Sequence, residues 1–283
     1  AAVLANEGFT ARALRAEVVD RCSGVSTAAV PALVDEGGSQ ALPAESVEVA
    51  EACRVLADWD GVYDLDRSGP PIWRELLAQY PPAALSAAGE LWAEPFDPAR
   101  PVETPSGLAP PPDGGDDPLL VRLARAVQIL QAAGIPLEAT LGEVQVADRN
   151  GTSVPIHGGN DRDGTVNIVG WARGWSILDP TLAALERRPV APGSSLATLA
   201  RGDGAELSAR YWINNGTSFL LALAYTPEGP RAKAHLTYGN TADRASPAYL
   251  DATERFSAKQ WRDVAFTDDQ IDAEQISVMT VRG

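Results

Sequence analysis

The sequence contains few of the residues on which metal and nucleophilic chemistry usually depends. Its 283 residues include 2 cysteines, 2 histidines and 1 methionine. The histidines, His157 and His235, lie far apart along the chain, and no Cys or His cluster has the spacing of a zinc site. Asp113, Asp116 and Asp117 carry oxygen ligands of the kind that calcium prefers, but their spacing is not that of an EF-hand. We therefore expect neither a metal nor a cofactor.

Basic charge and long apolar runs are also scarce. The chain has 23 Lys and Arg against 38 Asp and Glu, a net charge of -15. Binders of nucleic acid and of anionic membrane surfaces need clustered basic charge, so the composition argues against both partners. The longest apolar stretches, Val166–Leu178 and Phe219–Tyr225, are too short for a membrane span or are interrupted by Gly and Arg173. No basic region followed by a long apolar run opens the chain, so we expect no secretory signal here, as in a processed protein.

No familiar nucleophile is visible either. The chain has no G-x-S-x-G elbow, and neither Cys22 nor Cys53 lies beside a helix N-terminus or a basic pocket. His157 lies in the Gly-rich segment PIHGGND, where it is either a general base or a hydrogen-bonded loop residue. We favour the second interpretation, and we expect His235 to be a packed or edge-facing side chain within a strand.

The first part of the chain predicts helices, because apolar residues recur at steps of three and four. The predicted helices are Phe9–Cys22, Glu45–Ala57, Ile72–Gln79 and Leu119–Ala133. Between the last two, Pro95–Pro118 is dense in Pro, Gly and Asp, and its part PPPDGGDDP (Pro110–Pro118) cannot form a helix or an inner strand. This composition indicates a surface loop, with a linker as the alternative. Trp59, Trp73 and Trp92 are expected to anchor helices rather than to bind a ligand.

The second part predicts strands. Alternating residues on both sides of Asn150-Gly151 are typical of a β-hairpin. Other predicted strands are Thr165–Ala172, Arg210–Asn214, Ser218–Thr226, Lys233–Tyr238 and an edge strand at Ile276–Val281. Ser218–Thr226 is apolar on both faces, which is typical of a strand in a sheet covered on both sides. The fold class is therefore α+β, with a helical portion at residues 1–134, its loop near 95–118, and a strand-rich portion at residues 135–283.

The two cysteines leave two possibilities open. Cys22 and Cys53 each lie in a predicted helix, and neighbouring helices can bring two α-carbons within disulfide range. Two buried free thiols are the alternative.

Six segments, taken in order, resemble the C-terminal part of the β subunit of penicillin-acylase-type N-terminal-nucleophile hydrolases. They are most similar to the acylases of this family that act on aculeacin A or on acyl-homoserine lactones. The segments are LANEGFTARAL (Leu4–Leu14), RVLADWDGVYDLDRSGPPIWREL (Arg54–Leu76), WAEPFDPARPVETPSGL (Trp92–Leu108), IPLEATLGEVQV (Ile135–Val146), NNGTSFLLAL (Asn214–Leu223) and YGNTADRASPAYLDATERFSAKQW (Tyr238–Trp261). The last segment departs from the usual Gln, Pro and His of the family at Asn240, Arg244 and Ala248.

The resemblance implies a four-layer αββα sandwich and a processed, exported heterodimer, secreted or periplasmic in a bacterium. In this family the N-terminal Ser of the β subunit attacks the substrate amide and its own α-amine acts as base. That Ser and the oxyanion Asn belong upstream of Leu4 in the family order, and the first residue here is Ala1. The partners implied are the remaining acylase segments, and export implies a Cys22–Cys53 disulfide.

The resemblance leaves three candidates for facing the reaction centre: Asn214, Asn215 and Ser218. They would lie on a central strand, or Gly216-Thr217 would make a bulge or turn in which the asparagines bond to the backbone. Thr253–Phe256 and Trp261 match the family and are expected to be structural.

The sequence therefore predicts a component of an amidohydrolase that deacylates N-acyl compounds such as lipopeptides, acyl-homoserine lactones or penicillins. A noncatalytic interaction domain on an acylase scaffold is the alternative. A stand-alone hydrolase that uses His157 is a third, weaker hypothesis.

Overall fold

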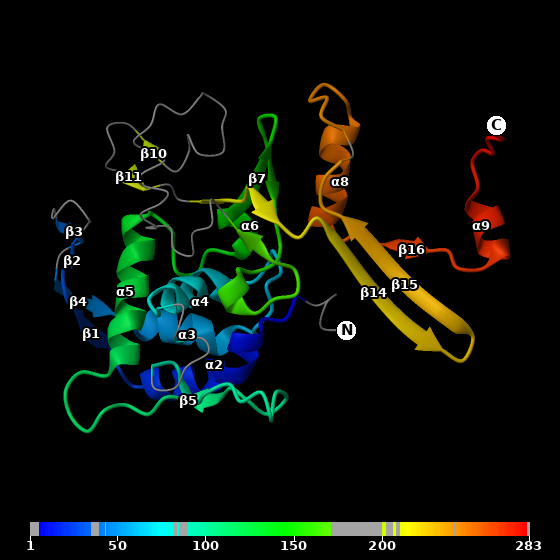
Figure 1. The fold of residues 1–283 in the computed structure, drawn as a ribbon. Coiled ribbons are helices and arrows are strands. Elements are labelled where there is room, and N and C mark those ends of the chain that lie inside the picture. The colour runs from blue at the N-terminus through cyan, green and yellow to red at the C-terminus, as the bar shows by residue number, and fades with distance from the viewer. Residues whose placement is uncertain are drawn as a thin grey trace. The chain divides into compact units, whose positions relative to one another are not determined.

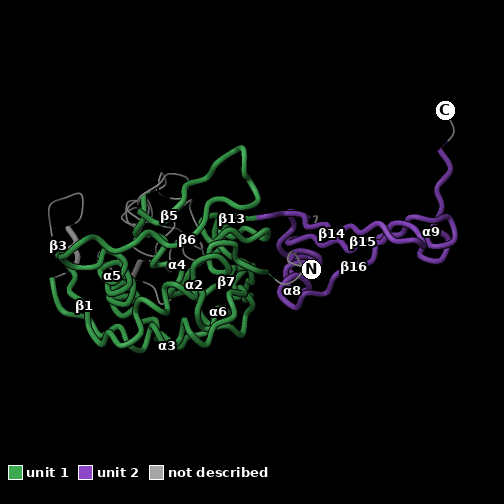
Figure 2. Tube along the Cα trace, turned by 90° about the horizontal axis from the view of Figure 1, so that it is seen from below, with its two compact units in different colours: residues 1–216 green, residues 217–283 purple. Residues whose placement is uncertain are grey.

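The computed structural model describes residues 6–34, 40–42, 44–81, 84, 90–170, 200–201, 206–207, 210–239 and 241–281. These residues form a mixed α/β structure of helices and small sheets. The chain divides into two compact units, unit 1 at Ala1–Gly216 and unit 2 at Thr217–Gly283, which Figure 2 shows in different colours. The boundary falls inside the NNGTS segment that the sequence singled out.

Four helices form the centre of unit 1: α2 (Phe9–Cys22), α3 (Ala50–Asp58), α4 (Gly69–Ala78) and α5 (Pro118–Ala132) (Figure 1). The predicted stripe of α2 faces the core, since Leu14 and Val18 are at most 1% exposed. Helix α5 begins after Asp117, whose carboxylate accepts the Leu119 N–H at 2.9 Å. The predictions of α2, α4 and α5 are confirmed to within a few residues.

The predicted helix at Glu45–Ala57 is wrong in its first turn. Residues Glu45–Glu48 form strand β4, which pairs antiparallel with β1 (Thr27–Val30). Helix α3 begins only at Ala50, whose N–H donates to the Glu48 carboxylate at 3.1 Å. Glu45 and Glu48 therefore precede the helix and Glu51 lies in its first turn, where negative charge suits the positive end of the helix dipole.

Short strand pairs surround the helices of unit 1. They are β2 (Leu33–Val34) with β3 (Gln40–Leu42), β5 (Trp92–Glu94) with β6 (Ser106–Leu108), and β10 (Ala200–Arg201) with β11 (Glu206–Leu207).

A three-stranded sheet, in the order β12-β7-β8, completes unit 1. It follows the short helix α6 (Leu141–Val144) and contains the predicted hairpin, β7 (Gln145–Arg149) and β8 (Thr152–Pro155). The hairpin is confirmed, because Asn150 and Gly151 both have positive φ, as a type I′ turn requires. Strand β12 (Tyr211–Trp212) pairs parallel with β7.

The predicted strand at Thr165–Ala172 is reduced to β9 (Val169–Gly170), which pairs antiparallel with β13 (Asn215–Gly216). Residues 171–172 lie outside the described part of the chain.

Aromatic packing joins α3 and α4, as expected for helix anchors. Trp59, Trp73 and Trp92 are at most 3% exposed. Trp59 packs edge-on against Tyr63 at 5.4 Å and donates its indole N–H to the Val62 carbonyl at 2.8 Å. A side chain at Gly69 would place its Cβ 2.3 Å from the Trp59 ring, so only glycine fits this approach.

Unit 2 is an antiparallel meander of β14 (Phe219–Thr226), β15 (Gly229–Leu236) and β16 (Arg262–Val264). Helix α8 (Ala248–Ser257) packs on β15, and Thr253 and Phe256 of this helix are each 1% exposed. Thr253 donates to the Thr237 carbonyl at 2.9 Å, which supports the structural role expected for Thr253–Phe256. A second helix, α9 (Asp268–Glu274), follows β16.

The predicted edge strand at Ile276–Val281 is wrong, because the structure has no strand there. Ile276 is 99% exposed and Val281 is 80% exposed. An alternating apolar pattern becomes a strand only when a neighbouring strand supplies hydrogen-bond partners.

Candidate functional site

The Gly-rich loop, which we define as residues 156–167, gathers many of the buried polar side chains of unit 1. It contains the 3-10 turn η2 (Asp161–Asp163). Its buried polar members are His157, Asn160, Arg162, Asp163, Thr165 and Asn167, all at most 5% exposed. The glycines allow close packing, since a Cβ on Gly158 would lie 2.5 Å from the Asn167 side-chain nitrogen. The loop is therefore a folded element of the core rather than a solvated turn.

His157 is a hydrogen-bonded residue of this loop. Its Nδ1 lies 2.9 Å from Asn6 Nδ2 and 3.1 Å from Asn167 Nδ2. Asn6 uses its second N–H for Asp64 at 2.8 Å, and Asn167 uses its second N–H for the His157 carbonyl at 2.9 Å. Because both neighbours of Nδ1 are amide N–H groups, the contacts fit the tautomer in which Nδ1 is the acceptor and Nε2 carries the proton. With 1% exposure, this side chain does not reach solvent as a general base would.

A second group of buried polar side chains adjoins the loop. We call it the Arg74 cluster, and it consists of Tyr63, Arg74, Glu75, Gln145, Asp163 and Tyr211. Arg74 makes an ion pair with Asp163 at 3.5 Å, and both side chains are 1% exposed. Its Nη1 donates to the Gln145 side-chain carbonyl at 2.5 Å, and its guanidinium lies 5.1 Å from the centre of the Tyr211 ring. The Tyr211 hydroxyl donates to Glu75 at 2.7 Å.

Burial dominates the electrostatics of this cluster. It raises the pKa of Asp163 above its ordinary value, although Arg74 and the Asn160 N–H partly offset the shift. It also raises the pKa of Tyr211 well above the ordinary value, and the nearby Glu75 carboxylate adds to the effect. For Tyr63, burial is again the larger cause of the raised pKa, and the Asp163 charge adds to it. The phenols therefore stay protonated at neutral pH, and Tyr211 acts as a hydrogen-bond donor.

The cluster can position backbone, but it is not open to a substrate. Tyr63, Glu75, Gln145, Asp163 and Tyr211 are all 0% exposed. They come from the segment between α3 and α4, from α4, β7, η2 and β12, so the cluster joins elements that lie far apart in the sequence. Sequence reasoning missed it. The available signal was the charged pair Arg74-Glu75 inside an otherwise apolar helix.

The three candidates for facing the reaction centre are all exposed. Asn214 and Asn215 lie at the end of unit 1, while Ser218 lies at the start of unit 2. The Asn214 N–H donates to the Gly170 carbonyl at 3.1 Å, and the Ser218 carbonyl accepts the Thr237 N–H at 3.2 Å. Among the described residues β13 pairs with β9 alone, so a central position of this strand stays a prediction.

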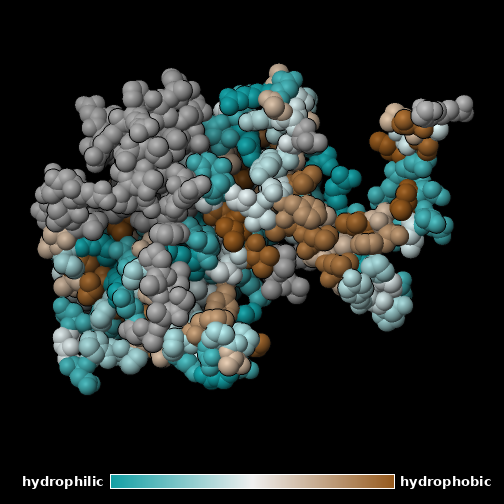
Figure 3. Space-filling view, in the orientation of Figure 1, coloured by the Kyte–Doolittle hydropathy of each residue, from teal (hydrophilic) through white to brown (hydrophobic). Residues whose placement is uncertain are grey.

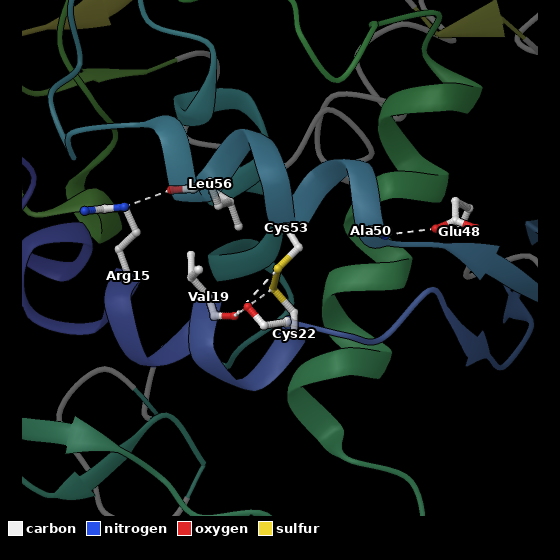
Figure 4. The surroundings of a disulfide bond; sticks show 8 residues. Arg15, Val19, Cys22, Glu48, Ala50, Cys53 and Leu56 are labelled. Atoms are coloured by element: carbon white, nitrogen blue, oxygen red, sulfur yellow. Dashed lines mark hydrogen bonds between the residues drawn. A yellow bond between two sulfur atoms is a disulfide. The ribbon is translucent and has the colours of Figure 1, made fainter.

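A disulfide joins Cys22, the last residue of α2, to Cys53 of α3, with their α-carbons 6.0 Å apart (Figure 4). This is the pairing that the family resemblance implies. An open depression of about 380 Å³ lies beside it. Its lining includes Val19, Val25, Ala50, Arg54 and Ala57.

The acidic loop before α5 contains Asp117, which caps that helix. Its Oδ2 lies 3.7 Å from Nε of Arg21. Across the described ranges, no group of three or more His, Cys, Asp or Glu side chains is arranged to hold a metal ion. No helix in that part of the chain has the length and apolar character needed to cross a membrane.

Comparison with known proteins shows to which protein family the chain is related. The sequence model of the penicillin amidase family matches residues 1–273. The acyl-homoserine lactone acylase PvdQ of Pseudomonas syringae pv. syringae is 29% identical over 81% of this chain and 25% of the relative. PvdQ of Pseudomonas fluorescens (strain Pf0-1) is 28% identical over 99% of this chain and 31% of the relative. The aculeacin-A acylase of Actinoplanes utahensis is 28% identical over 81% of this chain and 23% of the relative. The chain thus spans between a quarter and a third of the length of most of these curated relatives, and it belongs to the penicillin amidase family.

Proposed function

We propose that this chain is the C-terminal part of the β subunit of an acylase that hydrolyses the amide of N-acyl compounds. Family membership over residues 1–273 supports the reaction class, and relatives named as acyl-homoserine lactone acylase and aculeacin-A acylase indicate the substrate range. Acyl-homoserine lactones, lipopeptides and penicillins are the substrates to test. The Cys22–Cys53 disulfide fits export to an oxidising compartment, secreted or periplasmic.

In the proposed reaction, an N-terminal Ser on a companion polypeptide supplies the nucleophile. Its hydroxyl oxygen attacks the amide carbonyl while its α-amine accepts the hydroxyl proton. Collapse of the tetrahedral intermediate transfers that proton to the leaving amine and leaves an acyl ester, which water then hydrolyses. The burial of both histidines supports this assignment, because His157 at 1% and His235 at 4% exposure are poorly placed to act as a base.

The exposed apolar face of unit 2 is the observation that most supports a companion polypeptide. On β14, alternate side chains are 45–85% exposed: Phe219, Leu221, Leu223 and Tyr225. Leu236, opposite Phe219 on β15, is 52% exposed. Figure 3 shows apolar side chains gathered over β14 and β15.

On the other face of the same sheet, α8 covers the end that contains Leu220 and His235, whereas Ala224 on that face is exposed. Leu220 and its cross-strand partner His235 are each 4% exposed, and the His235 ring stacks on Phe256 of α8 at 5.4 Å. Along the strands of an antiparallel sheet with one solvent-exposed face, apolar and polar residues usually alternate. Here both faces of β14 are apolar, so a second layer from a companion polypeptide is the natural cover for the open face. The four-layer αββα sandwich of the family is the arrangement that we propose.

The test is to measure release of primary amine from an acyl-homoserine lactone and a lipopeptide by this chain, with and without a companion that begins with Ser. We expect turnover only from the complex, and loss of turnover when the companion Ser is replaced by Ala. Turnover by the isolated chain would refute the proposal. A complex that forms but hydrolyses none of the substrates would favour a noncatalytic interaction domain.

The companion interface has its own test. Leu221→Lys should abolish capture of the companion, because it buries an unpaired charge in the interface. Glu254→Lys, at an exposed position of α8, is the matched control and should bind normally. Equal binding by both variants would contradict the role of the apolar face.

A further inference from the structure

The segment from Tyr211 to Gly216 is held by very short strands. Strand β12 has two residues paired with β7, and β13 has two residues paired with β9. Between them, the Ile213 N–H donates to the Val146 carbonyl at 2.7 Å and the Asn214 N–H donates to Gly170. Two-residue strands have few ladder bonds, so the position of this segment depends strongly on side-chain anchors.

Tyr211 provides such an anchor. Its side chain is 0% exposed, its hydroxyl donates to Glu75 of α4 at 2.7 Å, and its ring lies against the Arg74 guanidinium. A hydrogen bond to a carboxylate is stronger and more directional than one between neutral groups. The bond therefore ties the strand that leads to Asn214 directly to a helix of the core.

The residue opposite Tyr211 belongs to the same cluster. Gln145 pairs with Tyr211 across the β7–β12 register. Its side chain accepts from Arg74 and donates to the Ile156 carbonyl at 2.6 Å and the Gly158 carbonyl at 3.0 Å. Helix α4, the hairpin, the Gly-rich loop and β12 therefore share one set of buried bonds. Removal of one partner would leave a polar group buried and unsatisfied, which makes the arrangement specific for one position of β12.

We propose that Glu75 and Tyr211 are positioning residues for the acylase reaction. They fix the exposed Asn214–Asn215 segment, which the family resemblance makes a candidate for facing the reaction centre; this inference rests on the proposed function. Neither residue touches the substrate. Their effect passes along the backbone through Trp212 and Ile213 to the asparagines.

Hydrogen exchange on the 283-residue chain tests the anchoring without any activity. Tyr211→Phe removes one hydroxyl and keeps the ring. We expect the amides of Ile213 and Asn214 to exchange at least tenfold faster, with no change in β14 and β15. Glu75→Gln keeps an oxygen that can accept the Tyr211 hydroxyl, so it should restore most of the protection that Glu75→Leu removes. Tyr225→Phe, at a side chain that is 85% exposed, is the matched control and should change nothing in unit 1.

Activity of the reconstituted complex gives the second readout. With Tyr211→Phe we expect kcat to fall about tenfold with KM little changed, and Glu75→Gln to stay closer to the parent than Glu75→Leu. Unchanged exchange at Ile213 and Asn214, or an equal rise across all of unit 1, would overturn the positioning role. So would faster exchange with unchanged kcat in an active complex. A local rise in exchange with an inactive parent complex would uphold the anchoring and count against the proposed acylase function instead.

Discussion

Reduction of the Cys22–Cys53 disulfide should destabilise unit 1 by a calculable amount. The bridge closes a loop with a sequence separation of 31 residues, which contains the β1–β4 strand pair. The loop-entropy relation gives about 12 cal/mol/K for a loop of this length, or about 3.7 kcal/mol at 25 °C. Cys22 and Cys53 are at most 7% exposed, so the reduced thiols can keep most of their packing and the change should be mainly the loop term.

Urea unfolding followed by tryptophan fluorescence measures this change, because Trp59 and Trp73 are buried in unit 1. We expect the free energy of unfolding of the parent chain to fall by about 3–4 kcal/mol in reductant. The double variant Cys22→Ala, Cys53→Ala should lose slightly more, because it also loses two sulfur atoms from the core, and should not respond to reductant. A fall of less than about 1 kcal/mol, with reduction verified by mass, would refute the reasoning.

Four further perturbations test other parts of the structure. Burial lowers the pKa of His235, and backbone hydrogen bonds at Arg255 and Phe256 only partly oppose this. Because the folded state favours the neutral imidazole, its contribution to the stability of unit 2 is fully present above the unfolded pKa of about 6.5. We therefore expect the melting temperature of unit 2 to fall as the pH drops from about 7 through the folded pKa. His235→Phe should make the melting temperature nearly independent of pH over that range. Arg74→Met leaves Asp163 buried without its cation and should cost about 3–5 kcal/mol in urea unfolding; a loss below about 1 kcal/mol would show that the ion pair is dispensable. Gly164 has a φ of +73°, and a Cβ there would lie 2.7 Å from the Phe9 Cβ. Gly164→Ala should therefore lower the free energy of unfolding by about 1–3 kcal/mol. An unchanged melting temperature would contradict the packing described. His157→Ala should lower stability through the lost Asn6 and Asn167 contacts, and a specific loss of kcat in a complex of normal stability would revive His157 as a base.

Features set by neighbouring residues could be predicted from the sequence. Asn150-Gly151 specifies its own turn, because both residues adopt positive φ readily and the flanking strands are contiguous. The apolar steps of α2 and the stop at Gly134 after α5 are local in the same sense. The sequence therefore predicted the hairpin and most helices of unit 1.

Features set by distant partners could not be predicted in this way. Glu45–Glu48 has an acidic, helix-like composition, yet pairing with Thr27–Val30 makes it a strand. The Arg74 cluster joins residues from Tyr63 to Tyr211, and no local pattern shows which buried charges meet. The family resemblance located Asn214 and Asn215 but not their short pairing with β9, which depends on a contact with Gly170.

The two-sided apolar pattern of β14 is an intermediate case. It predicted a sheet covered on both faces, and α8 covers the face that contains Leu220 and His235. The open face with Leu221 and Leu223 is the part of the prediction that we assign to a companion polypeptide.

The location of the acyl group during turnover tests the central claim most directly. The complex would be mixed with a slowly deacylated substrate, quenched in acid, and each polypeptide weighed intact by mass spectrometry. We predict that the companion gains the mass of one acyl group on its N-terminal Ser and that this chain gains none. An acyl adduct on any side chain of this polypeptide would contradict it.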